Sequence, residues 1–509
     1  MYDLEIIKRS HHILCKPNNS HARMMIDRFS TTLIKYSLSM VGGETVRVKD
    51  KVYATRNVTK QEYRFHYNLL DSFLNHCHSL KINIKEEPPI LGLIVDFPIF
   101  DKWKLRDDQE EYYNYAIENP KLWEQPNRIL TCQPGAGKSF IMMKSIAEYG
   151  RRTILFMRPG FVKNFVREMI DTFDIDISEI IFVAGIEELN DLISRAINND
   201  IFEKIIIISN KTYYFYISSY LELEPNIFSA RYNCHPDNFF KLLDVGYRLI
   251  DEVHLDFHFN HRLDLFTNIS KSLSSSATLV HGGDEFMKKI QEITYPQKDR
   301  FKQHGFNKYV DVIAQFYNLE HPNRVRTKNH GRGFYSHHVY EKYILKDKKR
   351  ADSYLSLIKE SIEISYVKNY KEGKKCLVFC TGADTGTVLQ EKIAKLYPNL
   401  KVGRYIATFK DPESVYQESD IIISTLGSCG TAKTIPNLST VILTIAVDSE
   451  AANLQGFGRL RDTKDNTKTT FVYFVCEDIT VHRNYHYKKR NYLEGRVVSI
   501  IENHTRIYV

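Results

Sequence analysis

Short apolar segments alternate with segments of helical periodicity along most of this 509-residue sequence. Chains with this alternation fold into βαβ units, in which consecutive strands lie parallel and helices cover the sheet. The alternation occurs in two separate series. The sequence therefore predicts an α/β fold with two parallel-sheet domains in tandem, preceded by a region of mixed pattern.

The position of each apolar run predicts the individual elements. In the first series we expect helices at Phe140–Tyr149 and Phe161–Phe173, and strands at Arg128–Cys132, Thr153–Met157, Ile205–Ser209, Tyr247–Ile250 and Ala277–Val280. In the second we expect helices at Thr385–Tyr397 and Ala451–Leu460, and strands at Cys376–Cys380, Asp420–Ser424, Val441–Ile445 and Phe471–Val475. The resulting domains are an α+β accessory domain (1–100), a first parallel-sheet domain (101–280), a linker or insertion (281–345), a second parallel-sheet domain (346–480) and a basic tail (481–509).

The composition excludes several classes of protein. Hydrophobic residues make up 43% of the chain and charged residues 26%, which is typical of a globular protein and not of a disordered one. The eight cysteines form no CxxC pair, so we expect neither a disulfide framework nor a tetrathiolate zinc site, and a reducing compartment. The apolar stretch Ile90–Phe100 is interrupted by Asp96 and Pro98 and is too short to span a membrane. The net charge of +8 permits a polyanionic partner without requiring one.

The most specific local pattern is Cys132-Gln-Pro-Gly-Ala-Gly-Lys-Ser139, between a predicted strand and a predicted helix. A phosphate-binding loop requires this context, because N–H groups at the start of the helix hold the negative charge. We expect Lys138 to reach the terminal phosphates and Ser139 to hold Mg²⁺. The residues that would surround the phosphates are Pro134, Gly135, Ala136 and Gly137.

A pair of carboxylates, Asp251-Glu252, follows the predicted strand Tyr247–Ile250. An ATPase needs such a group at a strand end near the loop, to bind the metal and to direct a water. Asp251 is the expected partner of Mg²⁺, and Glu252 is the expected group that orients or deprotonates the water. An isolated Asp-Glu is usually a solvated strand end, but its place downstream of a phosphate loop favours the catalytic interpretation.

Three further patterns occur in a fixed order along the chain. Gln109 precedes the loop and is able to pair with the adenine edge through two hydrogen bonds. The other two patterns are Ser276-Ala277-Thr278 and Gln455-Gly-Phe-Gly-Arg459-Leu-Arg461. The arginines of the last pattern are suited to stabilising γ-phosphate charge, because a guanidinium binds oxyanions in a bidentate way.

Together these residues resemble the superfamily 2 helicases of the DExH type, over roughly residues 101–480. Within that superfamily the chain is most similar to the transcript-release DNA helicases of poxviruses and their counterparts in other large cytoplasmic DNA viruses. The resemblance implies two RecA-like domains, with ATP and Mg²⁺ between them and single-stranded or partly duplex DNA or RNA across both. It also implies movement from 3′ to 5′, association with viral transcription machinery, and location in viral factories of the host cytoplasm or in the virion.

The resemblance implies roles for particular residues as well. His254 and Ser276-Ala277-Thr278 would couple hydrolysis to movement, and Gly427 to Lys433 would sense nucleotide and strand. Gln455, Arg459 and Arg461 would act at the γ-phosphate. The last arginine falls one position earlier than in the family pattern, with Asp462 in its place, so the choice of finger arginine stays open. Arg158-Pro159-Gly160 stands where the family commonly has Pro-Thr.

Other patterns favour ordinary structural roles. His254, His258 and His261 have helical spacing that would suit a metal, and His76-Cys77-His78 contains similar ligands, but packed or solvated side chains explain both. Two basic, aromatic-rich stretches are candidates for nucleic-acid contact or for solvated surface. They are Arg324–Lys328 and His482–Arg490.

Three classes of function remain open. The first is an ATP-driven helicase or translocase acting on DNA, with RNA unwinding as the alternative within the class. The second is a subunit that binds nucleic acid under the control of ATP without unwinding it. The third is a small-molecule kinase built on the same phosphate loop, and the second α/β series counts against it.

Overall fold

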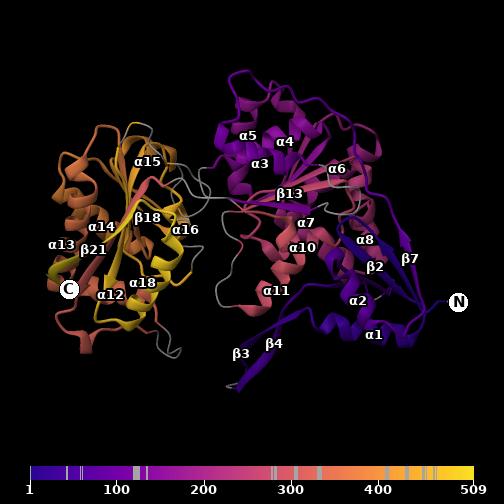
Figure 1. Cartoon of the computed structure of the whole chain (residues 1–509), viewed down its shortest axis with the longest axis horizontal. Helices are drawn as coiled ribbons and strands as arrows, with labels where there is room; N and C mark the ends of the chain where they lie inside the picture. The colour runs from indigo at the N-terminus through magenta and orange to yellow at the C-terminus, as the bar shows by residue number, and fades with distance from the viewer. Residues whose placement is uncertain are drawn as a thin grey trace. The chain divides into compact units, whose positions relative to one another are not determined.

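The computed structural model describes residues 2–41, 44–57, 59, 61–118, 127–132, 136–276, 279, 284–302, 308–328, 335–406, 412–429, 435–449, 453, 456–461, 465 and 467–509. They form two compact units, which meet in the sequence after Lys302. Figure 1 shows the elements of both units. Among the described residues, no helix combines the length and the apolar character needed to cross a membrane.

The chain begins with a mixed five-stranded sheet of order β5-β6-β2-β1-β7. Its central strands pair antiparallel, whereas β1 and β7 pair parallel. Two helices accompany it, and a separate two-stranded ribbon, β3–β4, extends from it. The elements are β1 (Leu4–Lys8), β2 (His12–Pro17), α1 (Ser20–Thr31), β3 (Ile34–Val41), β4 (Glu44–Val52), β5 (Thr55–Asn57), β6 (Glu62–His66), α2 (Leu70–His76) and β7 (Ile82–Glu86).

The second sheet of the first unit has seven strands, all parallel, in the order β10-β11-β9-β12-β13-β8-β14. Its strands are β8 (Asn127–Thr131), β9 (Thr153–Met157), β10 (Ile180–Val183), β11 (Ile205–Ser209), β12 (Tyr247–Ile250), β13 (Lys271–Ser276) and β14 (Arg300–Lys302). Its helices are α3 (Glu110–Ile117), α4 (Lys138–Tyr149), α5 (Pro159–Thr172), α6 (Ile186–Ile197), α7 (Asn210–Glu222), α8 (Pro225–Arg231), α9 (Phe239–Leu242), α10 (Phe257–Asp264) and α11 (Glu285–Thr294).

The two faces of this sheet bury alternate residues of the same strands. Leu155 and Ile207 face a core formed with α3, α4 and α5, while Ile154 and Ile206 face a core formed with α6, α7 and α9 to α11. Parallel strands covered on both faces read as continuous apolar runs. For this reason the sequence predicts β9, β11 and β12 with the bounds that the structure has.

The structure has a strand directly before the predicted strand Ala277–Val280, namely β13, Lys271–Ser276. Ala277, Thr278 and Val280 lie outside the described residues. All six residues of β13 are buried although most are polar. Their hydroxyl groups have specific partners, such as Tyr295 for Ser274 at 2.7 Å and His11 for Ser272 at 2.8 Å. A search for apolar runs misses a buried strand of this kind.

The N-terminal sheet packs against the α7–α11 face of the first parallel sheet and shares its core. Polar contacts fix the arrangement. The backbone N–H of Ser10 donates to Asn268 Oδ1 at 3.0 Å, and the guanidinium of Arg64 donates to both oxygens of Asp237 at 2.6 and 2.9 Å. Arg9 lies 2.9 Å from the same carboxylate.

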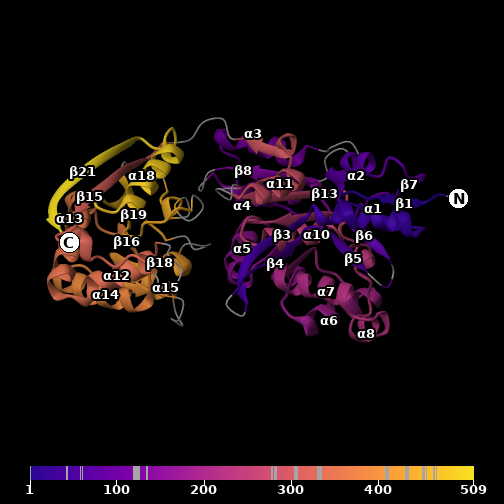
Figure 2. The same cartoon turned by 90° about the horizontal axis from the view of Figure 1, so that it is seen from below.

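The second unit contains another seven-stranded parallel sheet, of order β17-β18-β16-β19-β20-β15-β21. Figure 2 shows its helices on both faces. The strands are β15 (Val310–Asn318), β16 (Lys375–Cys380), β17 (Val402–Tyr405), β18 (Ile421–Thr425), β19 (Leu438–Leu443), β20 (Thr469–Cys476) and β21 (Ser499–Tyr508). The helices are α12 (His337–Lys346), α13 (Lys348–Ser365), α14 (Ala383–Leu396), α15 (Pro412–Glu418), α16 (Leu426–Cys429) and α18 (Thr480–Leu493).

The predicted fold class, two tandem RecA-like parallel-sheet domains with an N-terminal α+β domain, is confirmed. The second sheet draws on more of the chain than the expected range 346–480. β15 comes from the expected linker, and α18 and β21 come from the expected tail. The predicted helix Ala451–Leu460 falls largely outside the described residues.

The Asp237 ion pair provides a test of how the N-terminal domain is held. Burial alone would raise the pKa of Asp237, but Arg64 and Arg9 outweigh burial and hold it well below its usual value. Asp237→Ala leaves Arg64, which is 2% exposed, without this partner, and we expect a loss of about 3–5 kcal/mol in the free energy of unfolding. Denaturant unfolding of the whole chain measures it.

Asp171→Ala is the control, because its ion pair with Lys102 is exposed on both sides and contributes about 1 kcal/mol or less. The stabilisation from Asp237 is present above the ordinary carboxyl range. It is lost as the pH falls through the lowered pKa of this group. Equal destabilisation by the two variants would contradict this account.

Candidate nucleotide-binding site

The predicted phosphate loop lies between β8 and α4, which begins at Lys138. Its N-cap residue is Gly137, at φ +85°, where a Cβ would lie 2.0 Å from Gln109 Nε2. Glycine is therefore required here for both conformation and space. Gly137 also offers no side chain to cap the helix, and the positive end of the α4 dipole favours an anion. Gln133, Pro134 and Gly135 lie outside the described residues.

Cys132 and Ala136 line this turn as buried residues. Burial raises the pKa of the Cys132 thiol to about 11, so the thiol is neutral at pH 7. A neutral side chain at this position adds no repulsion toward a bound phosphate. The departure from glycine at position 132 is thus compatible with an anion-binding loop.

Gln109 is 2% exposed and contacts the loop directly. Its Nε2 donates to the carbonyl of Ala136 at 3.0 Å, and its Oε1 accepts from the N–H of Arg106 at 3.2 Å. The contact with Ala136 ties Gln109 to the phosphate loop. Its predicted contact with adenine stays a prediction.

The two predicted acidic residues follow β12 and lie beside the loop. Lys138 Nζ is 3.9 Å from Glu252 Oε1. Ser275 donates to Asp251 Oδ1, and the N–H of Glu252 donates to the same oxygen at 3.0 Å. Burial and the neighbouring charge of Glu252 raise the pKa of Asp251. The structure therefore brings Lys138, Asp251 and Glu252 together at the carboxyl ends of β8 and β12, the two strands on either side of β13.

Glu252 has a backbone conformation that non-glycine residues rarely adopt, with φ at +49°. Strained backbone that persists in a folded protein is concentrated at functional sites. The conformation supports a specific role for the Glu252 carboxylate.

His254 connects Glu252 with the end of β13. Its Nδ1 lies 2.8 Å from Ser276 Oγ and 3.3 Å from Glu252 Oε2. Two of the predicted coupling residues, His254 and Ser276, are thus in contact with each other. Ala277 and Thr278 lie outside the described residues.

Glu168 of α5 is a residue of this site that the sequence did not indicate. The Ser139 hydroxyl interacts with its carboxylate, and both burial and the charge of Asp251 act on it, with burial raising its pKa. Glu168 carries no motif, and only the packing of α5 beside α4 brings it here. No signal in the sequence would have found it.

The oxygen atoms around Ser139 and Asp251 fit a magnesium ion. Mg²⁺ prefers carboxylate and hydroxyl oxygens, together with waters and phosphate oxygens. Burial and the charge of Glu252 raise the pKa of Asp251, and burial and the charge of Asp251 raise the pKa of Glu168. A divalent cation would offset the excess negative charge.

The predicted finger residues belong to the second unit. The Arg461 guanidinium donates to the carbonyls of Gly458 and, at 2.9 Å, of Leu460, and burial lowers its pKa. Arg459 follows the turn at Gly456, with its N–H 3.3 Å from that carbonyl. Gln455 lies outside the described residues.

The remaining predicted positions have the following surroundings. Arg158 is the N-cap residue of α5 and donates two hydrogen bonds to Asp256, at 2.7 and 2.8 Å. His261 lies 3.1 Å from the carbonyl of Tyr53, and the described residues contain no cluster of three or more His, Cys, Asp and Glu suited to a metal. Of the segment Gly427 to Lys433, only the part up to Cys429 is described, in α16.

The two basic stretches differ in accessibility. Arg324, Arg326 and Lys328 are exposed. The other stretch lies on α18, where His482, His486 and Lys489 are buried. Burial lowers the pKa of Lys489 to about 7, and its Nζ lies 4.4 Å from the centre of the Tyr473 ring. Only part of the α18 stretch is therefore available to a nucleic acid.

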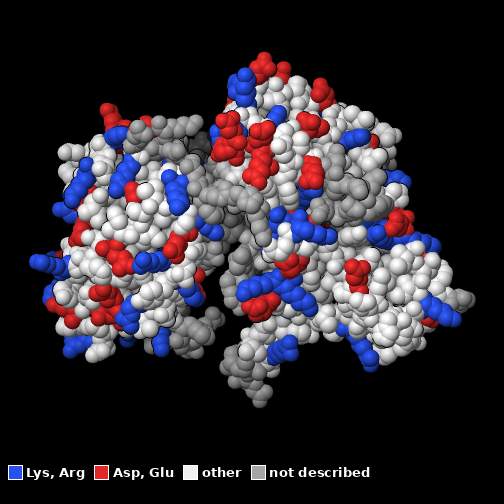
Figure 3. All heavy atoms as spheres, in the orientation of Figure 1, with Lys and Arg blue, Asp and Glu red and all other residues white. Residues whose placement is uncertain are grey.

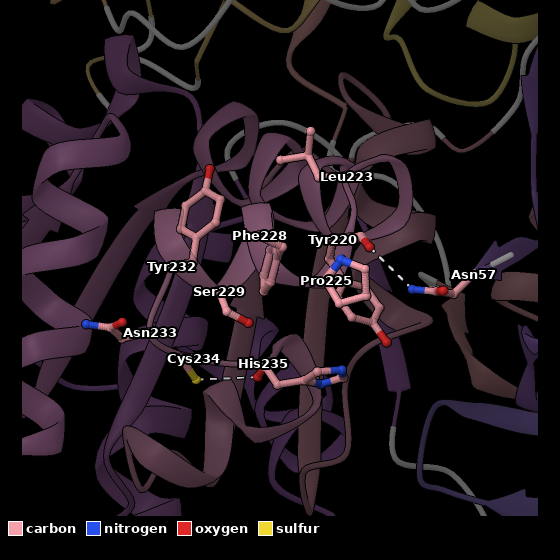
Figure 4. Close-up of a pocket in the computed structure, with 10 residues that line it drawn as sticks. All are labelled: Asn57, Tyr220, Leu223, Pro225, Phe228, Ser229, Tyr232, Asn233, Cys234 and His235. Carbon is pink, nitrogen blue, oxygen red and sulfur yellow. Dashed lines mark hydrogen bonds between the residues drawn. The ribbon is translucent and has the colours of Figure 1, made fainter. Parts of the chain in front are cut away.

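A cavity of about 250 Å³ lies elsewhere in the first unit, beside α7 and α8. Figure 4 shows its lining, in which the rings of Tyr220, Phe228 and Tyr232 are prominent. Asn57 of β5 closes one side and donates to the carbonyl of Tyr220 at 3.3 Å. None of the predicted nucleotide-binding residues lines this cavity.

No protein-family model and no curated protein matches the chain. Solved structures do. S. cerevisiae Dbp5 bound to RNA and ADP BeF3 matches with a TM-score of 0.49 and 12% identity, over 79% of this chain and 90% of that one. T4 UvsW matches with a TM-score of 0.34 and 12% identity, over 99% of each chain. Mss116p bound to ssRNA and AMP-PNP matches with a TM-score of 0.47 and 14% identity, over 76% and 74%.

The backbone at Glu252 yields a prediction about stability. Glu252→Gly and Glu252→Ala both remove the carboxylate, but only glycine adopts a positive φ without steric cost. We expect the glycine variant to be more stable than the alanine variant by about 1 kcal/mol. Thermal unfolding of the two proteins side by side measures the difference. A more stable alanine variant would show that the residue is unstrained.

Proposed function

We propose that the chain is an ATP-driven nucleic-acid motor of helicase superfamily 2. The observation that carries the proposal is the cluster of Lys138, Asp251 and Glu252, with Lys138 at the start of a helix suited to phosphate and 3.9 Å from Glu252. The connection from Glu252 through His254 to Ser276 supports coupling between hydrolysis and the rest of the domain. A simple nucleotide-binding protein would need no such connection.

In this proposal each residue has a separate task. Lys138 and the first N–H groups of α4 bind the β- and γ-phosphate oxygens of ATP. Ser139 and Asp251 would hold Mg²⁺, which neutralises phosphate charge when it is bound. Glu252 accepts a proton as the water oxygen attacks the γ-phosphorus and the bond to the bridging oxygen breaks. Arg459 supplies positive charge to the γ-phosphate.

We further propose that the track is DNA, travelled from 3′ to 5′, and that the activity serves transcription or transcript release in a large DNA virus. These finer assignments rest on the resemblance in sequence. RNA unwinding is the alternative within the class. A nucleic-acid-binding subunit that uses ATP without unwinding is the alternative outside it, and the complete acidic pair beside Lys138 favours the motor.

Lys138→Ala tests the phosphate loop. We expect ATP turnover, stimulated by single-stranded DNA, to fall by about 10²-fold or more, because the lysine stabilises phosphate charge. Glu252→Gln is expected to bind ATP and not to hydrolyse it. Lys144→Ala, on the same helix, is the control and keeps turnover. More than roughly a tenth of the normal rate in Lys138→Ala would refute the assignment.

Arg459→Ala and Arg461→Ala separate the two arginines. Because Arg461 binds carbonyls of its own segment, we expect its loss to lower the unfolding temperature. Loss of Arg459 should lower turnover and leave nucleotide affinity nearly unchanged. Measurements of turnover, nucleotide binding and thermal unfolding on both variants distinguish the roles. The reverse pattern would make Arg461 the finger.

A further inference from the structure

The β3–β4 ribbon projects from the first unit, and no third strand among the described residues pairs with it (Figure 1). Its strands pair antiparallel from Ile34 opposite Val52 to Val41 opposite Glu44. Eight residues in a strand extend over about 27 Å. A ribbon of this length has two long faces, and the described part of each is accessible to a partner.

One face of the ribbon is basic and aromatic. The register places Tyr36 opposite Lys49 and Leu38 opposite Arg47, so these four side chains share a face. The Arg47 guanidinium lies 4.1 Å from the centre of the Tyr36 ring. Arg47 and Lys49 are both exposed. The other face carries Ser37, Ser39, Val46 and Val48.

Two features of this face raise the free energy of the protein when no partner is bound. Leu38 is 74% exposed, and Arg47 and Lys49 place two positive charges on the same face of one strand. Like charges on neighbouring positions of a sheet face repel each other. Both costs disappear if the face lies against a polyanion, which neutralises the cations and covers the apolar atoms.

The root of the ribbon is fixed on the elements that follow the nucleotide-site residues. Tyr53, directly after β4, is buried against His258 and His261 of α10, and its hydroxyl donates to Met287 of α11 at 3.2 Å. Lys35 forms an ion pair with Asp284 at 2.5 Å. α10 follows His254 in the chain and α11 follows Ser276. The base of the β3–β4 ribbon is therefore fixed to the rest of the first unit.

We propose that the β3–β4 ribbon binds duplex DNA by entering its major groove, with Arg47 and Lys49 contacting phosphates. The major groove of B-form DNA admits a two-stranded β-ribbon, and cations along the ribbon neutralise the phosphates that border the groove. The inference goes beyond the proposed ATPase, because binding by the ribbon requires no nucleotide.

The shape of the groove favours duplex DNA over duplex RNA, and the surface charge of the first unit favours the ribbon as the place of contact. A-form RNA has a deep, narrow major groove that side chains cannot enter, so duplex RNA does not fit. The acidic surface over α3 directs a polyanion away from that part of the first unit. Figure 3 shows this surface, to which Asp107, Asp108, Glu110 and Glu111 contribute.

The test compares two charge-reversed variants of the whole chain. Arg47→Glu with Lys49→Glu alters the ribbon, and Lys211→Glu with Lys241→Glu makes the same change in net charge at exposed positions of α7 and α9. Binding is measured without nucleotide at several salt concentrations. The three probes are a 20-bp DNA duplex, an RNA duplex of the same sequence and a single DNA strand. Thermal unfolding confirms that both variants fold.

We expect the ribbon variant to bind duplex DNA roughly tenfold or more weakly at 0.1 M salt than the control does. The slope of log K against log salt should fall by about 2, one for each lost phosphate contact. Binding of duplex RNA should be equal in the two variants. Lys138→Ala should bind duplex DNA normally, so failure of the ATPase proposal would leave this result unaffected.

Three outcomes would overturn the inference. The first is equal affinity and salt slope for the ribbon variant and the control. The second is a loss confined to the single strand, or equal for DNA and RNA duplexes, which would exclude groove binding. The third is normal duplex binding with lost sedimentation on phosphatidylserine vesicles, which would make the ribbon a membrane-surface contact.

Discussion

The parallel pairing of β12 with β13 brings the carboxylates after one strand against the hydroxyl groups of the next. Ile250 pairs with Ser274, so Ser275 lies beside Asp251, and Ser276 comes within reach of His254. Serine suits this strand because its hydroxyl groups bond to Asp251 and His254, and an apolar residue would remove those hydrogen bonds at a cost of about 1–3 kcal/mol each. β13, which lies between β12 and β8 in the sheet, therefore also forms part of the polar lining of the candidate site.

The N-terminal domain is part of the same construction. Its sheet shares a core with the face of the parallel sheet opposite to α4, and Tyr53 packs on α10 and α11, which follow His254 and Ser276 in the chain. A conformational change at the end of β12 or β13 can therefore reach the base of the β3–β4 ribbon through α10 and α11. The proposed motor and the proposed DNA-binding arm would be joined through packed side chains and not through a flexible linker.

The fold was predictable where an apolar strand is buried along its whole length. β9, β11 and β12 match the predicted ranges because strands covered on both faces leave little room for polar residues. β13 was missed because its polar side chains are satisfied by distant partners. β15 and β21 were missed because they belong to sequence that reads as basic connecting segments, although β15 lies beside β20 and within the sheet.

The chemistry of the site was already present in the sequence, since Lys138, Asp251 and Glu252 belong to short motifs whose residue types and order suit phosphate and metal. Only the tertiary structure brought in Glu168 next to Ser139, the positive φ of Glu252, and the shared face of Tyr36, Leu38, Arg47 and Lys49. Motifs are local, and their meaning survives in a linear sequence. Strand order, register and helix packing join residues far apart in the chain, and these depend on which surfaces the whole fold can bury.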